Sequence, residues 1–513
     1  MISFPAVTDP EYNTAADPGV DFVKAVARLK GGRLLLVGDL MLDEMIRGAA
    51  ERLSPDAPVP VLSIDGESAI DRRPGGTGNV AVCLKGLEAE VSIVGLIGDD
   101  EAGRQLISSL ESVGCETGGI VVDPNRPTTV KRSLVGLAQH RHPQKMFRLD
   151  VESREAASDE IVERMLEAID ARIDAVDCVC LEDYDKGGCP PALCRALVER
   201  CRARGVPLLV DPAAIEDYSR YAGASLITPN RSEAELATNR PGGLDTDLEA
   251  AVTIAIGLRE THDFDVVVLT LDRDGAMLAT EKGCTHLPTE AKSVYDVTGA
   301  GDMVLAALAV AWAHGLRGVE GVRLANLAAG IEVTLTGAQP VPLADLRRAA
   351  LLASTAGRGK VRQLEHLLLE LEVLRRDGRR IVLTNGCFDV IHAGHVAYLR
   401  EARQQGDLLV VGINADASVR AIKGPERPIF NEEERLEVLS ELQSIDYLVV
   451  FEEPTADRLI ESVSPHTYVK GGDYQESEIA EYELLKRLGI EIGILAHRPG
   501  LGSTAIIDRI RSS

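Results

Sequence analysis

The chain has 513 residues, which is more than one hydrophobic core usually supports, so two or three domains are expected. Its 45% hydrophobic and 26% charged residues are typical of a folded globular protein and argue against disorder. The formal net charge of -25 repels phosphate backbones and anionic membrane surfaces, which excludes nucleic acid and membranes as general partners. Small phosphates remain possible ligands, because local backbone N–H groups and a few cations suffice to bind them.

Three further features indicate a cytoplasmic protein. The nine cysteines are odd in number and form no CxxC pair, which is typical of reduced thiols. The first twenty residues are acidic and contain proline, without the basic start and apolar block of an export signal. The longest apolar run, MVLAALAVAWA at 303–313, is shorter than the ~20 residues that a bilayer requires, and it predicts a buried helix.

Short apolar runs alternate with helical stretches along the first two thirds of the chain. Runs such as RLLLVGDL (33–40) and EVSIVGLIG (90–98) are apolar almost throughout, as in strands covered on both faces. They predict an α/β domain with a doubly wound parallel sheet. Two turn-flanked regions alternate instead, PVPVLSID (58–65) and the pair PTTVKRSLV with KMFRLD (127–150), and predict a small antiparallel β lid.

The pattern changes to helix near residue 342 and returns to α/β alternation near residue 380. A glycine-containing break, TAGRGK, separates two helical patterns in between. We therefore expect a first domain at 20–345, a helical linker at 346–379 and a second domain at 380–513. The runs RRIVLTNG, DLLVVGIN, DYLVVF and IGILAH predict that the second domain is a smaller, doubly wound, Rossmann-like fold.

The stretch DVTGAGD precedes the long apolar helix of the first domain. The backbone N–H groups of Gly299, Ala300 and Gly301 would point together at the helix N-terminus, and such a nest binds phosphate. Asp302 at the helix start is able to take a proton from an attacking hydroxyl, whereas the commoner use of an aspartate there is to cap the helix. The loop alone leaves both interpretations open.

Residues 33–340 resemble the ribokinase-like (PfkB) sugar kinases. DVTGAGD is similar to their C-terminal signature and RPGGTGNVAVCLKGLEAEVSIVGLIGDD to their N-terminal glycine motif, while TPNRSEAE supplies the Asn-x-x-Glu of the family as Asn230 and Glu233. The resemblance implies that Asp302 is the catalytic base and that the amides of 299–301 form an anion hole.

The same resemblance implies ATP and Mg2+ as the cofactors of this domain. Asn230 and Glu233 would organise the Mg-ATP, and Asn326 would contact the nucleotide. Val297 departs from the pattern, since most of the family has threonine there. No residue is expected to bind a resident metal on its own.

The segment VGDLMLDEMIRGAAERLSPDAPVPVL resembles the corresponding part of kinases that act on D-glycero-β-D-manno-heptose 7-phosphate. By this resemblance the sugar would be bound by residues of the first strand and the glycine motif: Asp39, Asp43, Gly75, Gly76 and Asn79. Charge and lid position make three more residues candidates for the 7-phosphate: Arg52, Lys131 and Arg132. The alternative for these three cations is a solvated lid surface.

LTLDRDGAML superficially matches the Asp-x-Asp loop of haloacid-dehalogenase phosphatases. Asp272 and Asp274 follow an apolar strand, but the chain has no room for a phosphatase domain at this point. We interpret the stretch as a turn that uses Gly275 as its glycine.

The stretch TNGCFDVIHAGHVAYLREAR suggests a second phosphate site. A strand would deliver Gly386 to a tight turn, and AGHVAYLREA has helical apolar spacing. His392 and His395 would then lie at the helix N-terminus, where histidines donate hydrogen bonds to negative oxygens without a metal. A structural histidine pair is the alternative, and zinc would need a third ligand for which no suitable spacing is found nearby.

Residues 380–513 resemble the nucleotidyltransferase superfamily with the His-x-Gly-His motif. Further matches are AIKGPERPIFNEEER, FEEPTADRLI, YVKGGDY and GLGSTAIIDRI. The resemblance implies that His392 and His395 stabilise the pentavalent α-phosphate and that Lys423 neutralises the triphosphate. It assigns nucleotide contacts to Thr384, Gly386, Phe388, Ser503 and Thr504.

Four further residues of this domain complete the expectation. Asp416 and Lys470 would shape the nucleotide and sugar-phosphate pockets. Gly502 replaces the first serine of the usual final motif, which removes one hydroxyl donor. Cys387 in the glycine turn is expected to pack rather than to attack, because the reaction transfers AMP directly onto a phosphate.

Taken together, the motifs most closely resemble the bifunctional enzymes of ADP-heptose synthesis, which make a precursor of the lipopolysaccharide core. The first domain would phosphorylate heptose 7-phosphate at O1, and the second would join AMP to heptose 1-phosphate and release pyrophosphate, both with Mg-ATP. The alternatives are another sugar kinase fused to a cytidylyltransferase, or one domain that only binds nucleotide. Open edges of the lid strands favour a homodimer.

Overall fold

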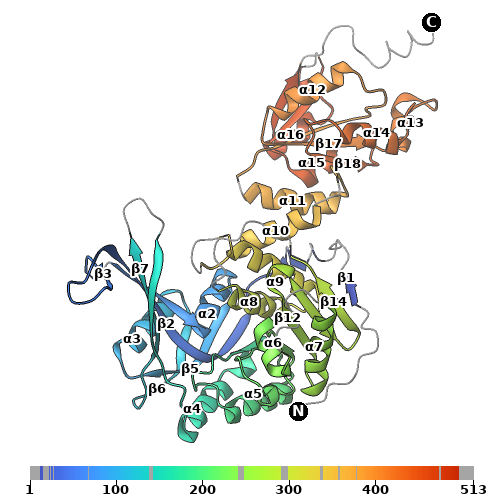
Figure 1. The fold of residues 1–513 in the computed structure, drawn as a ribbon. Coiled ribbons are helices and arrows are strands. Elements are labelled where there is room, and N and C mark those ends of the chain that lie inside the picture. The colour runs from blue at the N-terminus through green and yellow to red at the C-terminus, as the bar shows by residue number, and fades with distance from the viewer. Residues whose placement is uncertain are drawn as a thin grey trace. The chain divides into compact units, whose positions relative to one another are not determined.

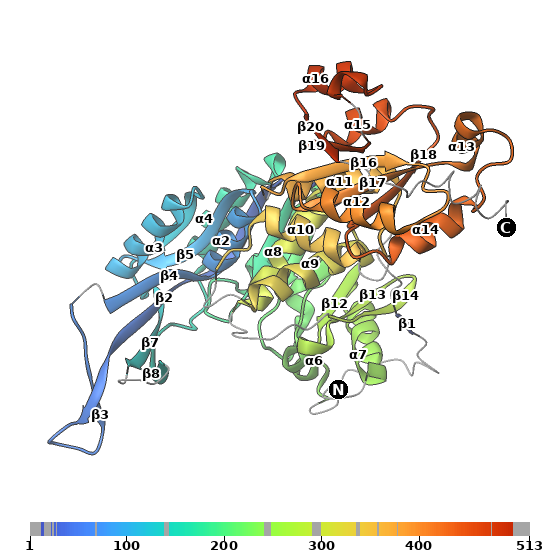
Figure 2. The same ribbon diagram turned by 90° about the horizontal axis from the view of Figure 1, so that it is seen from above.

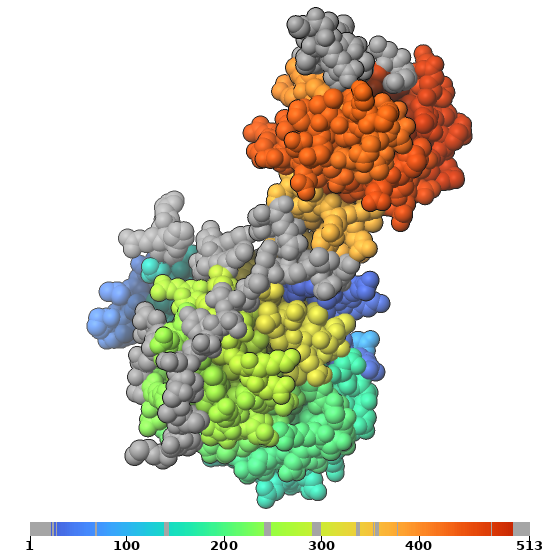
Figure 3. All heavy atoms as spheres, turned by 90° about the vertical axis from the view of Figure 1, so that its right-hand side faces the viewer, coloured from blue at the N-terminus to red at the C-terminus, as the bar shows by residue number. Residues whose placement is uncertain are grey.

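The chain forms two compact units in a computed structural model (Figure 1). One unit consists of residues 1–18 and 28–350, and the other of residues 19–27 and 351–513. The structure describes residues 12–14, 22, 25–26, 28–66, 69–137, 143–240, 248–289, 299–334, 339–355, 359–376, 378–472 and 475–495, and the others are grey in Figure 3. Within the described ranges, no helix has both the length and the apolar character needed to cross a membrane.

A mixed sheet forms the centre of the larger unit. Its strands in spatial order are β1 (Tyr12–Thr14), β14 (Gly283–Leu287), β13 (Ala276–Thr280), β12 (Val266–Thr270), β11 (Leu226–Ile227), β10 (Leu208–Asp211), β9 (Cys178–Glu182), β2 (Arg33–Leu53), β5 (Glu90–Gly98) and β6 (Glu116–Asp123). The strands from β12 to β6 run parallel, as expected, whereas β13 is antiparallel to both of its neighbours. Short turns on both sides of β13, at 271–275 and 281–282, explain the change of direction, because a hairpin can only join antiparallel strands.

Helices cover both faces of this sheet (Figure 1). One face packs against α4 (Asp159–Asp170), α5 (Pro191–Arg204), α6 (Arg231–Thr238) and α7 (Leu248–Thr261). The other carries α2 (Thr77–Gly86), α3 (Glu101–Ser112), α8 (Ala300–Ala313) and α9 (Val319–Glu332). Every residue of β9 is buried, which agrees with the apolar run predicted to be covered on both sides. The run predicted as a buried helix is α8, and almost all of its side chains are inaccessible.

The predicted lid is present, and the long strand β2 belongs to both the lid and the sheet (Figure 2). The outer part of β2 pairs antiparallel with β3 (Pro60–Ser63) and β4 (Ile70–Gly76), and parallel with β7 (Thr129–Leu137). Strand β8 (Gln144–Val151) pairs antiparallel with β7. The lid is therefore mixed rather than purely antiparallel, because β7 enters it beside β2 in the direction of the main sheet.

The smaller unit contains an all-parallel sheet, as predicted. Its spatial order is β15 (Val361–Arg362), β18 (Tyr447–Phe451), β17 (Leu408–Asn414), β16 (Ile381–Gly386), β19 (Thr467–Gly471) and β20 (Glu491–Leu495). The strand order reverses between β16 and β19, so the carboxyl ends of these two strands flank a topological switch point. Ligands of open α/β sheets bind in the crevice at such a point.

Helices also flank the sheet of the smaller unit on two sides. One core contains residues of α11 (Leu364–Arg376), α15 (Asp457–Val463) and α16 (Tyr482–Leu488), and the other of α12 (Ala393–Arg403) and α14 (Glu432–Ser440). Helix α13 (Asp416–Lys423) also belongs to this unit, whereas most of α10 (Leu343–Thr355) belongs to the larger one, which ends at residue 350. Helix α11 lies in the stretch expected to be a linker, yet its Leu367 and Leu371 are fully buried in the core of this unit.

Truncation of a core leucine in α11 should loosen the smaller unit alone. Leu371→Ala is expected to destabilise it by about 2–5 kcal/mol, because the buried side chain leaves a cavity. Amide hydrogen exchange should accelerate in β16 to β18, while the fluorescence of the single Trp312 follows an unchanged larger unit. Glu372→Ala, at a half-exposed neighbour, is the control. Equal exchange in both variants would contradict the assignment of α11 to this core.

Candidate functional site

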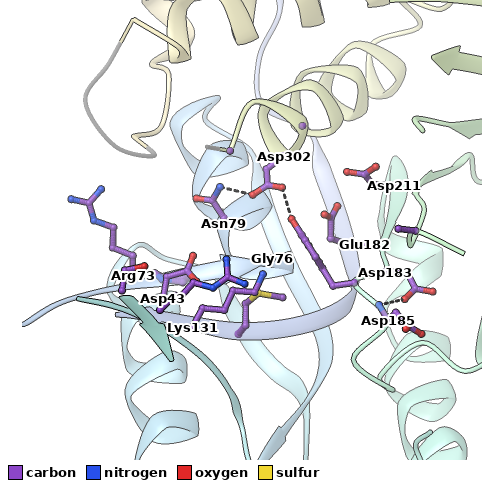
Figure 4. A pocket seen from close by; sticks show the side chains of 18 of the residues that line it. Asp43, Arg73, Gly76, Asn79, Lys131, Glu182, Asp183, Asp185, Asp211 and Asp302 are labelled. Atoms are coloured by element: carbon purple, nitrogen blue, oxygen red, sulfur yellow. Dashed lines mark hydrogen bonds between the residues drawn. The ribbon is translucent and has the colours of Figure 1, made fainter. Parts of the chain in front are cut away.

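A cavity of about 920 Å³ in the larger unit lies beside the carboxyl ends of β9 and β10. It extends from the N-terminus of α8 to the lid strands β2, β7 and β8 (Figure 4). Many of the residues singled out from the sequence line it: Asp43, Gly76, Asn79, Lys131, Asn230, Glu233, Gly299, Gly301 and Asp302. Segments that are more than 200 residues apart in the sequence therefore meet in one pocket.

Asp302 lies in the first turn of α8 and is buried. Its Oδ2 accepts a hydrogen bond of 2.5 Å from Asn79 Nδ2, and its Oδ1 accepts one of 3.0 Å from the Tyr184 hydroxyl (Figure 4). Burial raises the pKa of Asp302 to about 6, although both hydrogen bonds oppose the rise. Two donors thus hold an ionisable carboxylate in the pocket, which suits a proton acceptor better than a helix cap.

The backbone before Asp302 has the geometry of an anion nest. Gly299 precedes α8 with φ 97°, a left-handed conformation that glycine adopts without strain. The N–H groups at the start of α8 have no partner within the helix and are available to negative oxygens. The preceding Val297 lies outside the described residues.

Two further carboxylates stand beside Asp302, and the sequence analysis had not singled them out. Glu182 ends β9 and Asp211 ends β10, and ligand oxygens of these two residues and Asp302 all lie within 4.8 Å of one another. Burial raises the pKa of Glu182 and of Asp211 well above the usual range, and repulsion by neighbouring carboxylates adds to the effect. An acidic residue at the end of an apolar strand, as in VCLED and LLVD, was the available signal.

Asn230 and Glu233 form a reciprocal cap at the start of α6. The Asn230 N–H donates to Glu233 Oε2 at 2.8 Å, and the Glu233 N–H donates to Asn230 Oδ1 at 3.0 Å. Both residues also line the cavity. Burial raises the pKa of Glu233 to about 6. The motif therefore has a structural use, and it also presents oxygen atoms to the pocket.

The lid end of the cavity carries the opposite charge. Six cations line it: Arg47, Arg73, Lys131, Lys145, Arg148 and Arg154. Lys131 Nζ lies 4.8 Å from the centre of the Tyr184 ring. Figure 4 shows Arg73 and Lys131 on the lid side, away from Glu182 and Asp211. The pocket thus has an acidic floor and a lid end with more basic than acidic side chains, since Asp43, Glu44 and Asp71 also line it and Asp71 pairs with Arg47 and Arg73.

The structure separates the three cations proposed for a sugar phosphate. Lys131 lines the cavity, whereas its neighbour Arg132 donates to Glu44 at 2.5 Å, because successive side chains of a strand point to opposite faces. Arg72 donates to the same Glu44 at 2.9 Å. Arg52 is exposed in the outer lid and does not line the cavity.

Three other residues from the sequence analysis do not line the cavity. The buried Asp39 carboxylate accepts hydrogen bonds from the backbone N–H groups of Tyr184, Lys186 and Gly188 at 2.8–3.0 Å, so it orders the loop that carries Tyr184. At Gly75 a Cβ would come within 2.5 Å of Asp43 Oδ2. Asn326 Nδ2 donates to the carbonyl of Leu287 at 3.1 Å.

Asp272 and Asp274 form a turn, as interpreted from the sequence. Both carboxylates pair with Arg231, at 3.2 and 2.5 Å, and Gly275 follows with φ 90°. Ala300 begins α8 between Gly299 and Gly301. No haloacid-dehalogenase loop is formed here.

In the smaller unit, the two histidines meet at the N-terminus of α12. His392 is the cap residue, and its Nδ1 accepts a hydrogen bond of 3.1 Å from the Gly394 N–H. The His392 and His395 rings stack with centroids 4.0 Å apart, and the Phe388 ring lies 5.4 Å from His395. Phe388 has φ 45°, so the turn after Gly386 at the end of β16 is tight. The pair lies beside the switch point of the sheet.

Arg435 is fully buried and ties the segments around this site together. Its guanidinium donates to the carbonyls of Cys387 and Asn414 at 2.7 and 2.9 Å and to Asp416 Oδ1 at 2.7 Å. It thereby joins the loop after β16, the end of β17 and the start of α13. The sequence analysis missed this residue, because an arginine in a charged helix such as NEEERLEVLS reads as solvated.

A second polar network lies at the end of β19. Lys470 Nζ donates to Glu481 Oε1 and to the Tyr468 hydroxyl, both at 3.1 Å, and Tyr468 donates to Asn385 at 2.5 Å. Thr384 is buried and its hydroxyl lies 2.6 Å from that of Tyr398. These contacts hold β16 and β19 together at the crevice.

The remaining residues of this unit differ in accessibility. Lys423 ends α13 and is exposed. Burial raises the pKa of the Cys387 thiol, which agrees with packing rather than nucleophilic attack. Gly502, Ser503 and Thr504 lie outside the described residues.

Loss of the buried guanidinium should destabilise the smaller unit. Arg435→Met is expected to cost about 3–5 kcal/mol, because it leaves two carbonyls and Asp416 without their donor. Arg487→Met removes an exposed pair with Glu461 and should cost no more than about 1 kcal/mol. Urea midpoints from pulsed hydrogen exchange in β16 and β17 compare the two. Similar midpoints would refute a central role for Arg435.

The comparisons with known proteins agree with two catalytic units. Residues 51–345 match the pfkB family carbohydrate kinase model, and residues 383–509 match the cytidylyltransferase-like model. The chain is 40% identical to "Bifunctional protein HldE" of Pelobacter propionicus over 484 residues, covering 94% of this chain and 97% of the relative. It is 40% identical to the protein of the same name from Geobacter sulfurreducens, over 93% of this chain and 95% of the relative.

Solved structures agree with the fold of the larger unit. Phosphofructokinase-2 of Escherichia coli in complex with potassium superposes with a TM-score of 0.51 and 17% identity, covering 64% of this chain and 99% of that one. At this identity the likeness concerns the fold alone.

Proposed function

The chain belongs to the family of bifunctional HldE proteins, the ADP-heptose synthases, and we propose how its residues divide the two reactions of that family. It is a heptose 7-phosphate kinase joined to a heptose 1-phosphate adenylyltransferase, and ATP is the substrate of both activities. The observation that carries the residue assignment is the arrangement of Asp302 and the glycine nest at one end of a cavity whose other end is basic.

In the kinase reaction, Asp302 accepts the proton of the sugar O1 hydroxyl. Asn79 and Tyr184 hold the carboxylate in its ionised form and aim it into the cavity. The O1–phosphorus bond forms as the bond to the ADP oxygen breaks, and the N–H groups of 299–301 bind the oxygens of the transferred phosphoryl group. The products are ADP and a heptose bisphosphate.

The charge asymmetry of the pocket orients the sugar. The 7-phosphate binds Lys131 and the neighbouring lid cations such as Arg73, because the carboxylates at the floor repel it. Asp43 and Asn79 lie between the two ends and bind sugar hydroxyls. O1 then faces Asp302, and the phosphate end stays at the lid.

In the adenylyl transfer, an oxygen of heptose 1-phosphate attacks the α-phosphorus of ATP and pyrophosphate leaves. This nucleophile is already ionised, so the site needs no general base. His392 and His395 donate hydrogen bonds to the α-phosphate at the positive end of α12. Lys423 neutralises the triphosphate, Lys470 binds the sugar phosphate, and Asp416, which Arg435 holds, shapes the nucleotide pocket.

Mg2+ accompanies ATP in both reactions under this proposal. The donor set of the kinase pocket fits the ion, since Mg2+ prefers carboxylate and amide oxygens and keeps several waters and phosphate oxygens as ligands. Asn230 and Glu233 would hold it on the kinase side. The ion supplies charge neutralisation of the phosphates when bound.

Three wider statements complete the proposal. Since neither site has phosphatase chemistry, a separate phosphatase must remove the 7-phosphate between the two reactions. The enzyme acts in the cytoplasm, where its nine thiols stay free. It forms a homodimer through the lid, where Phe147 on β8 is 63% exposed and Leu149 is 46% exposed.

Two single substitutions should separate the activities. Asp302→Asn should lower the kinase rate by about 10²–10⁴-fold, because the general base is lost, and should leave adenylyl transfer intact. His395→Ala should do the reverse. Phosphorus NMR with Mg-ATP and either heptose 7-phosphate or heptose 1-phosphate follows both products.

The wild-type enzyme decides the substrates in the same experiment. Formation of an anomeric phosphate in one tube and of ADP-heptose with pyrophosphate in the other is the expected result. Turnover with CTP in place of ATP would reassign the second unit as a cytidylyltransferase. Retention of both activities in either variant would refute the site assignment.

The basic lid predicts a difference between two adjacent residues. Lys131→Met should lower kcat/KM for heptose 7-phosphate by about 10- to 100-fold, since a charged hydrogen bond is worth roughly 1.5–3 kcal/mol. Arg132→Met should change it less, because Arg132 does not line the cavity and Arg72 still pairs with Glu44. Initial rates over a range of sugar concentrations measure both. Equal losses would remove Lys131 from the phosphate site.

A further inference from the structure

Two charged residues outside the kinase cavity form a short ion pair. Lys186 Nζ lies 2.6 Å from Glu152 Oε2, and neither residue lines the cavity. The Lys186 side chain is 11% exposed and that of Glu152 is 25% exposed, so both charges are largely removed from water. Desolvation offsets much of the attraction in such a pair, so its main consequence is that two segments are held in one relative position.

The pair joins the lid to the loop that carries Tyr184. Glu152 directly follows β8 of the lid, whereas Lys186 belongs to the loop at 183–188 that follows β9. Tyr184, two residues before Lys186, donates a hydrogen bond of 3.0 Å from its hydroxyl to Asp302 Oδ1. The ion pair therefore lies next to a donor that holds the carboxylate of the proposed base.

The backbone of this loop has a conformation that requires support. Asp185 has φ 53° and Gly187 has φ 80°, so two left-handed residues flank Lys186. A left-handed backbone is unfavourable for a residue with a side chain, and it persists where the surroundings hold it. The Arg126 guanidinium supplies part of this support, because it donates to the carbonyls of Lys186 and Ser153. The side chain of Lys186 adds a second link to the same lid segment.

Asp39 holds the same loop from the side of the main sheet. Its carboxylate accepts hydrogen bonds from the N–H groups of Tyr184, Lys186 and Gly188 at 2.8–3.0 Å. The loop is thus anchored on one side to β2 and on the other to the segment after β8. Loss of the ion pair would weaken the second anchor and leave the first intact.

We propose that Lys186 and Glu152 are positioning residues of the kinase reaction, whose ion pair fixes the loop at 183–188 so that the Tyr184 hydroxyl reaches Asp302. Lys186 acts through Tyr184 and not on the substrate, since it does not line the cavity. A displacement of about 1 Å near a reacting group can lower a rate by about 100-fold. This role rests on the proposed kinase function, whereas the anchoring of the loop rests only on the contacts of Lys186.

A double-mutant cycle tests the route through Tyr184. Lys186→Met should lower kcat for heptose 7-phosphate by about tenfold, in the range that the loss of a hydrogen bond to a charged group costs, and should leave KM nearly unchanged. Glu152→Gln should have the same effect. Tyr184→Phe lowers kcat by itself, and either change should lower it by less than about twofold more in that background, because the positioned hydroxyl is already absent.

Two further variants complete the kinetic test. Lys186→Arg keeps the positive charge and should retain most of the wild-type kcat. Arg33→Met removes an ion pair of the same length, 2.6 Å to Asp177, that is more exposed and does not line the cavity. It should change neither kcat nor KM.

Amide hydrogen exchange tests the anchor without any substrate. Lys186→Met should accelerate exchange of the loop amides that Asp39 binds, at Tyr184, Lys186 or its replacement, and Gly188, because weaker anchoring favours local opening. Exchange in β9 should stay unchanged. Arg33→Met should leave the loop as protected as in the wild type.

The outcomes separate this inference from the proposed function. Faster exchange in the loop of a protein whose wild type does not phosphorylate heptose 7-phosphate would support the anchor and overturn the kinase substrate. Unchanged exchange, fully additive losses in the Tyr184→Phe background, or a raised KM with unchanged kcat would each overturn the positioning role. If Lys186→Met does not fold, judged by the fluorescence of Trp312, Glu152→Gln removes the same pair from the other side and decides by the same criteria.

Discussion

Buried negative charge at the ends of parallel strands is the constraint on which the larger unit depends. Glu182, Asp211 and Asp302 are brought together where β9, β10 and α8 meet, and under the proposed function a triphosphate binds at the same place. Hydrogen-bond donors directed at Asp302 reduce the cost of burying its charge. Asn79 and Tyr184 serve Asp302, and the N-terminus of α8 offers N–H groups to the phosphates. Under the proposed function catalysis uses these same donors, so the stability of the pocket and its chemistry would have one origin.

Strand β2 connects the main sheet, at the floor of the cavity, with the lid. Its first part is central in the main sheet, and its outer part carries the lid, so Asp43 lies on a strand whose start is locked by β5 and β9. The pairing of β7 with β2 places Lys131 toward the pocket and Arg132 toward Glu44. A shift of register by one residue would exchange these two cations, which is why the lid must pair tightly with β2.

Under the proposed function the smaller unit also binds a triphosphate, but with fewer charged side chains. Its histidines lie at the N-terminus of α12 beside the switch point, where the parallel sheet provides a crevice without any special loop. Arg435 then fixes the loop after β16 relative to β17 and α13 from inside the core. The buried Arg435 guanidinium thus joins backbone carbonyls of separate segments and makes this part of the site rigid.

The amino-acid sequence by itself determined the fold class of both units and the family, and it predicted the motif residues Asp302, Asn230, Glu233, His392 and His395 as site candidates. Local patterns carry that information, because apolar runs, glycine turns and helix starts depend on near neighbours in the chain. Only the tertiary structure showed that Tyr184, Glu182 and Asp211 lie beside Asp302. It also showed that Lys131 lines the cavity whereas Arg132 pairs with Glu44, and that Arg435 is buried. Each of these contacts depends on which strand or helix from a distant part of the chain packs alongside. The spacing of residues within one sequence does not contain that information.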